Sequence, residues 1–209
     1  MRIAVAAVGV VVAVAAATGA VALAITAAAT GERTPTVLAS APGSASAEPV
    51  SESDFCFVES MIFYRVEAVE IGNVVLDTEG ITAETRERAA AIVAEQSAQV
   101  DDLREWYISW GSAKPLERPD EGPCAAHGAH ADMPGIPTWG QRTDLSNGSG
   151  AEAEELYLSL MPAMNAGVID LAATTTAADA HSLVRAAAED AIAQAERDTE
   201  LLRAVATGP

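Results

Sequence analysis

The sequence is short of positive charge and of aromatic side chains. Its 209 residues carry 12 Lys and Arg against 30 Asp and Glu, a formal net charge of -18. A chain this acidic repels phosphate backbones, so we expect no nucleic-acid partner. Aromatic residues make up 4% of the chain although 50% is hydrophobic, and Ala, the strongest helix former, supplies much of that half. This composition favours helices over a β-sandwich and excludes collagen-like and disordered chains.

Residues that usually carry catalysis are scarce as well. The chain has 3 His and 2 Cys, no glycine-rich phosphate loop and no Gly-x-Ser-x-Gly turn. Three His leave little for a nucleophilic triad. The predicted helices contain no Glu-x-x-His, the pair on which a di-iron bundle site depends. We therefore predict that the protein is not an enzyme.

A long uncharged stretch occupies the N-terminal end. Residues 3–29 contain only Ala, Val, Gly, Leu, Ile and Thr, and as a helix they would span roughly 40 Å, more than a ~30 Å hydrocarbon core. Residues 1–29 are either a transmembrane anchor or a signal segment that is cleaved. Residues 30–51, rich in Pro, Ser and Ala, form a linker. We expect the remainder on the extracytoplasmic side of the cell membrane, or secreted if the leader is cleaved.

The two cysteines and a nearby group of soft ligands carry separate expectations. Cys56 and Cys124 in an exported chain favour a disulfide, which would stabilise the fold by roughly 4 kcal/mol on the chain-entropy model. Two free thiols are one alternative. A metal site is the other, because His127, His130 and Met133 follow Cys124. These ligand types suit copper or zinc, although their spacing matches no closed-site pattern.

Four segments show helical spacing of apolar residues. They run over about 53–76, 82–110, 149–171 and 179–205, with caps expected at Ser51 or Ser53, at Thr82 and at Ser149. Residues 112–148 are rich in Pro and Gly and are predicted to be a crossover loop, with Met133 and Trp139 as its packing anchors. In the first helix, one apolar stripe follows Phe55, Val58, Ile62, Val66 and Val69, and a neighbouring one follows Met61, Arg65, Ala68 and Gly72.

The second pair of segments resembles the first. The first and third segments align at an offset of 100 residues, and the second and fourth align at an offset of 98, which matches Gln96 with Gln194. The chain is therefore predicted to contain a duplicated helix hairpin, 52–111 and 149–206, within a domain of residues 52–209. We predict an all-α fold, a four-helix bundle with one long crossover.

Short motifs in this order resemble a known exported family. They are Asp54-Phe55, Met61-Ile62, Gln96, Met133-Pro134-Gly135, Met161, Gly167 and Gln194. The chain resembles the ferritin-like family known as domain of unknown function 305, which implies a ferritin-like bundle and metal handling, especially of copper, by a His pair in each copy. This chain has Tyr64-Arg65 and Met164-Asn165 at those positions. Arg cannot ligate copper and Asn ligates it poorly, so the resemblance implies a member that lacks the family's metal site.

These observations lead to a non-enzymatic binding or scaffold domain. We expect it to be anchored by its N-terminal helix, to bind no cofactor and to have an unknown protein partner in the cell envelope. The alternative is a copper- or zinc-binding envelope protein that uses His127, His130 and Met133. Arg65 either snorkels to the surface or points inward with partners; the candidate partners are Glu59, Glu67, Glu70, Asp170, Asn165 and Tyr64.

Overall fold

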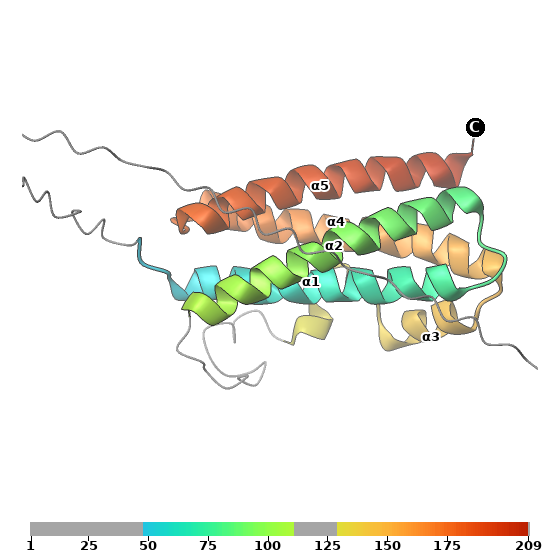
Figure 1. The fold of residues 1–209 in the computed structure, drawn as a ribbon, viewed down its shortest axis with the longest axis horizontal. Coiled ribbons are helices and arrows are strands. Elements are labelled where there is room, and N and C mark those ends of the chain that lie inside the picture. Colours follow the sequence, from blue (N-terminus) through green and yellow to red (C-terminus); the bar gives the residue numbers. More distant parts are fainter. Residues whose placement is uncertain (1–47, 111–128, 209) are drawn as a thin grey trace, which may run out of the picture. The chain divides into compact units, whose positions relative to one another are not determined.

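A computed structural model describes residues 48–110 and 129–208 of the chain (Figure 1). Within these residues the secondary structure is entirely helical. Its elements are α1 (Glu52–Asp77), α2 (Ala83–Trp110), the short turn η2 (His130–Asp132), α3 (Trp139–Asn147), α4 (Gly150–Ala177) and α5 (Ser182–Thr207). The predicted leader over 1–29, most of the linker, Cys124 and His127 lie outside the described residues. The all-α prediction is confirmed.

The four long helices form a bundle of two hairpins. α1 packs along α2 and α4 packs along α5, while α1 and α4 join the hairpins and α3 lies against both of them (Figure 1). α2 and α5 touch each other over a much smaller area. The duplicated hairpins therefore meet mainly through α1 and α4, as the alignment of the first and third segments predicts.

Capping side chains fix where the helices begin. Ser51 caps α1 together with Asp54, and the Thr82 hydroxyl accepts from the backbone N–H of Thr85 at 3.3 Å. At α4, the Glu152 carboxylate accepts from the backbone N–H of Ser149 at 2.9 Å. These caps confirm the predicted helix starts. Each one satisfies donors that the first helical turn leaves without partners.

The predicted crossover loop was wrong over its last part. Thr138 and Gln141 form a capping box that starts the helix α3, so a helix-start signal was present in the sequence but overlooked among the Pro and Gly residues. Trp139 was expected to anchor this segment, yet it is 81% exposed. Met133 and Ile136 are the buried anchors.

The apolar residues of α1 and α5 are not all buried. On α1 the buried side chains follow the neighbouring stripe, with Met61, Arg65 and Ala68, whereas Ile62 and Val69 are half-buried. On α5, Leu183 and Leu201 belong to the apolar pattern of the sequence but are 48% and 39% exposed. α1 is apolar on most of its circumference, so its apolar residues alone do not indicate which side faces the partner helix.

One of the described helices, α4, is long and apolar enough to cross a membrane. Its buried side chains belong to the hydrophobic core of the bundle, where Tyr157, Met161, Met164 and Val168 pack with residues of the other helices. A core helix of a bundle has the same length and composition as a spanning helix. The feature therefore fits its place in the core.

The segment between η2 and α3 closes over the junction of α1 and α4. The Tyr64 hydroxyl donates to the carbonyl oxygen of Pro134 at 2.8 Å. Gly167 of α4 lies directly beneath that carbonyl, where a Cβ atom would overlap it. Gly135 has φ +79°, and a Cβ atom there would overlap the carbonyl group of Ala163. The segment thus follows the helix surface at a distance that only glycine allows.

Candidate functional site

The positions of the family's His pairs lie in the interior of the bundle. Tyr64, Arg65, Met164 and Asn165 are each at most 3% exposed. Tyr64 bonds to Pro134, and the Asn165 amide donates to the Thr199 hydroxyl at 3.1 Å. Met164 packs in the hydrophobic core. These side chains are therefore engaged with the protein itself.

Arg65 points inward, one of the two orientations that the sequence left open. Its Nη1 donates to Oε1 of Gln96 at 3.2 Å, so its observed partner is an amide of α2. None of the partners expected from the sequence makes this bond; they were Glu59, Glu67, Glu70, Asp170, Asn165 and Tyr64. The α1–α2 pairing places Gln96 within hydrogen-bond distance of the guanidinium.

Burial lowers the pKa of Arg65 to about 10, because desolvation disfavours the charged form. The negative charges of Asp198 and Glu95 oppose this shift. The guanidinium remains protonated at neutral pH. A fixed positive charge therefore occupies the interior where the resemblance would place a copper ligand.

Arg65 and Gln96 belong to a layer of buried polar side chains inside the bundle, here called the polar layer. Further amide side chains extend it to α5. Nε2 of Gln99 donates to Oε1 of Gln194 at 2.8 Å, and Gln96 and Gln194, the aligned residues of the two repeats, are 1% and 2% exposed. Several buried atoms of the layer have no hydrogen-bond partner among the described residues. They are Nε of Arg65, Oε1 of Gln99, Nε2 of Gln194 and Oδ2 of Asp198. The layer therefore has hydrogen-bonding capacity that the described part of the protein does not use.

Two buried carboxylates, Asp198 and Glu67, have different positively charged neighbours that oppose the effect of burial on their pKa. Burial raises the pKa of Asp198, and the nearby Glu95 adds to the shift, while Arg65 and Arg197 oppose it. Burial also raises the pKa of Glu67, although Arg142 from α3 forms an ion pair with it at 2.6 Å. In both cases desolvation outweighs the nearby positive charge.

The pKa of Asp198 predicts a pH effect on stability. Its pKa in the folded state is above the ordinary value, so the folded state binds the proton more tightly and the carboxyl destabilises the fold once it ionises. We expect Asp198→Asn to raise the melting temperature relative to the parent chain at pH 7, by about 2–4 °C, and to do so less as the pH falls toward the ordinary Asp range. Circular dichroism melting curves at several pH values measure this difference. Asp101→Asn, at an exposed site of α2, serves as the control, and an equal gain in both variants would contradict the assignment to burial.

The predicted metal ligands do not gather in the described part of the chain. His130 stacks on Phe63 with ring centroids 5.3 Å apart, and its Nε2 lies 3.6 Å from Oε1 of Glu59. Met133 is 8% exposed and packs in the core. Among the described residues, no group of three or more His, Cys, Asp or Glu could hold a metal ion. His127 lies outside these residues, so the crossover site stays a prediction.

Cys56 lies in α1 and is 3% exposed. No cysteine in the described part of the chain is a free thiol. The predicted partner, Cys124, lies outside the described residues. The disulfide therefore also stays a prediction.

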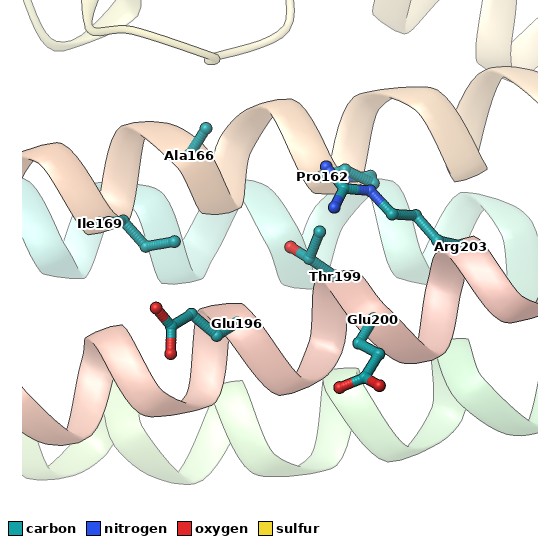
Figure 2. Close-up of a pocket in the computed structure, with 7 residues that line it drawn as sticks. All are labelled: Pro162, Ala166, Ile169, Glu196, Thr199, Glu200 and Arg203. Carbon is teal, nitrogen blue, oxygen red and sulfur yellow. The ribbon is translucent and has the colours of Figure 1, made fainter.

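Among the described residues, two of the grooves between neighbouring helices are large enough for a small molecule. The first, here called the α2–α5 groove, has a volume of about 380 Å³ and a floor of Phe57, Met61 and Arg65 from α1. The second lies between α4 and α5, has a volume of about 450 Å³ and is shown in Figure 2. Its charged side chains, Glu196, Glu200 and Arg203, are exposed. Of these two grooves, the α2–α5 groove is the one that combines an apolar floor with a buried charge, that of Arg65.

The α2–α5 groove was not predicted from the sequence. The signal that it contained was the conflict between a charged residue, Arg65, and an inward position of the first helix. The aligned pair Gln96 and Gln194 gave a second signal, since amides repeated at an inward position indicate a polar layer in a bundle. The separation of α2 from α5, which opens the groove, depends on packing angles that the apolar pattern does not determine.

Comparisons with known proteins agree with this fold. The sequence model of a family described as "Domain of unknown function (DUF305)" matches residues 54–206. A crystal structure of a DUF305 fragment from Deinococcus radiodurans is similar with a TM-score of 0.63 and 19% identity, covering 76% of this chain and 97% of that one. The crystal structure of a DUF305 protein from Streptomyces coelicolor, described as secreted, is similar with a TM-score of 0.62 and 24% identity. The similarity covers 72% of this chain and 89% of that one.

A third structure, CopM in the Cu(II)-bound form, is similar with a TM-score of 0.56 and 14% identity, covering 72% of this chain and 93% of that one. At these levels of identity, the three structures support the fold alone. No curated protein sequence matches the chain.

Proposed function

Because the chain belongs to the DUF305 family, we propose that it is a non-enzymatic binding or scaffold domain in which the family's paired-His site has been replaced. The observation that carries the proposal is the buried Arg65, which holds a positive charge inside the bundle and bonds to Gln96. A second positive charge, such as a copper ion, would be repelled there. The domain would therefore bind something other than a metal cation.

The other pair positions are equally unsuited to copper. Burial raises the pKa of Tyr64 to about 12, since desolvation disfavours the phenolate, so a neutral hydroxyl bonded to Pro134 stands at this position. Asn165 is engaged with Thr199, which leaves the thioether of Met164 alone. One thioether does not make a copper site. Although CopM binds Cu(II), we therefore expect no copper ion at these positions of this chain.

The proposed location is the extracytoplasmic side of the cell envelope. A secreted relative supports it, together with the uncharged stretch over residues 3–29, which would act as a membrane anchor. A disulfide between Cys56 and Cys124 would suit this oxidising compartment. The partner of the scaffold would then be another envelope protein.

A metal-retention experiment tests the proposal. The full-length chain, in detergent, is loaded with copper or zinc, desalted and analysed for metal, with CopM as the positive control. We expect no stoichiometric metal to remain. Near-stoichiometric metal that is lost when His127 and His130 are replaced by Ala would overturn the proposal and assign a metal function to the crossover, while retention that depends on Met164 would place a metal at the former pair position.

A further inference from the structure

We infer that the α2–α5 groove binds a small apolar monocarboxylate, whose carboxylate lies against the guanidinium of Arg65. The inference rests on the proposed binding role and names its ligand class. It starts from the position of Arg65, which is 3% exposed and forms part of the groove floor. A buried positive charge beside the apolar floor of the groove would fix the orientation of a bound ligand.

The hydrogen bonds of Arg65 are incomplete without such a ligand. The guanidinium has five N–H donors. Its one hydrogen bond to another described side chain goes to Gln96, and its Nε has no partner in that part of the chain. None of the ion pairs formed by the described residues includes Arg65. Carboxylate is the group that guanidinium binds best, by charge-assisted hydrogen bonds.

The neighbouring amides complete the head-group site. Gln194 lines the groove, is 2% exposed and has an Nε2 donor without a partner among the described residues. A rotation of the buried Gln194 amide toward the groove would present this donor to the second oxygen of the same carboxylate. Oε1 of Gln99, which also lacks a described partner, remains for a water molecule. Donors from α1 and α5 would thus converge on one anionic head.

The rest of the groove defines the body of the ligand. Phe57, Met61, Leu103, Trp106 and Leu183 line it, and the volume of about 380 Å³ is near the lower end for small-molecule pockets. These surfaces favour an aliphatic or aromatic body that the groove can remove from water.

Charge at the rim limits the ligand further. Asp102 and Asp190, which are exposed, also line the groove, and Asp198 and Glu95 lie near Arg65. These carboxylates repel any anion, so the groove tolerates a negative charge only where Arg65 pairs with it, and a second, unpaired charge on the ligand would be repelled. The groove therefore suits monocarboxylates and excludes dicarboxylates.

Equilibrium dialysis of the full-length chain, in detergent, against 3-phenylpropionate tests the inference. We expect saturable binding near one molecule per chain, and no comparable binding of 3-phenylpropionamide or succinate. Arg65→Met should weaken the binding by about tenfold or more, the usual value of a charge-assisted hydrogen bond. Arg203→Met, at the α4–α5 groove of Figure 2, is the matched control and should change it by less than about twofold.

A second variant keeps the test decisive if Arg65→Met does not fold. Ala187 lines the groove, so Ala187→Phe fills it while Arg65 stays in place, and binding should again be lost. Unchanged binding in a folded Ala187→Phe variant, or equal binding of the amide, would overturn the inference. Displacement by chloride without any dependence on the apolar body would mean an adventitious ion only. If the chain binds no 3-phenylpropionate and also retains no metal, the inference of a monocarboxylate ligand is wrong. The proposal that the metal site has been replaced would still stand.

Discussion

Replacing Gly167 by alanine is expected to destabilise the bundle by about 3 kcal/mol, at the upper end for overpacking in a core. A Cβ atom at this position would overlap the carbonyl oxygen of Pro134 and would lie 2.5 Å from the hydroxyl oxygen of Tyr64. The obstacle is backbone, so no side-chain rotation relieves it. Either the segment around Pro134 lifts away and the Tyr64 hydrogen bond breaks, or α4 shifts within the core.

The melting temperature of the full-length chain measures this effect. For a domain of this size a loss of about 3 kcal/mol corresponds to about 6–12 °C. Gly140→Ala is the control, because a Cβ at this exposed position in α3 meets its nearest atom, Oγ1 of Thr138, at 3.9 Å. In a helix this change should be neutral or slightly stabilising. Equal melting temperatures for the two variants would show that the segment does not pack on α4 as described.

Replacing Glu154 by alanine is expected to cost about 2 kcal/mol, since one carboxylate joins the two hairpins. Glu154 of α4 accepts from the backbone N–H of Thr82 at 3.0 Å and from its hydroxyl at 2.5 Å, and it also accepts from the hydroxyl of Thr85. Thr85 is completely buried. Its hydroxyl would lose a charged acceptor in a place that water does not easily reach, and the negative charge at the start of α2 would be lost as well.

The pH dependence of a second variant, Glu154→Gln, isolates the contribution of the negative charge. Burial would raise the pKa of Glu154, but the hydrogen bonds from Thr82 and Thr85 outweigh it and hold the pKa below the ordinary value. A lowered pKa contributes stability above the ordinary Glu pKa, and this stability is lost as the pH falls through the folded-state value. Urea unfolding of Glu154→Gln should thus approach that of the parent chain in acid. Glu155→Ala, at the adjacent exposed position, should have little effect at any pH.

The bundle itself was predictable because its signals are local. Apolar spacing indicated four long helices, Ser51, Thr82 and Ser149 marked where three of them begin, and the repeat predicted which helices correspond. The short helix α3 was missed, because the Pro and Gly residues around it suggested a loop. Its capping box at Thr138 was nonetheless readable from the sequence.

The candidate site was predictable only in part. The sequence shows directly that other residues stand at both His-pair positions. For Arg65 it allowed two orientations, inward or toward the surface. Its partner Gln96 was not foreseen, because the facing of α1 and α2 depends on which of two adjacent apolar stripes is buried. The groove required in addition the angle between α2 and α5, which results from packing of side chains distant in sequence.

The pairing of neighbouring helices has a consequence for the order of folding. α1 and α2 are connected by a short turn, and they leave the ribosome before α4 and α5 are made. The first hairpin can therefore form early from contacts that are close in sequence, which are the fastest to make. Until α4 arrives, Tyr64 of α1, which lies beside Gly167 of α4 in the folded bundle, has no cover from that helix. The newly made hairpin thus exposes an apolar face for as long as synthesis of the crossover and the second hairpin takes.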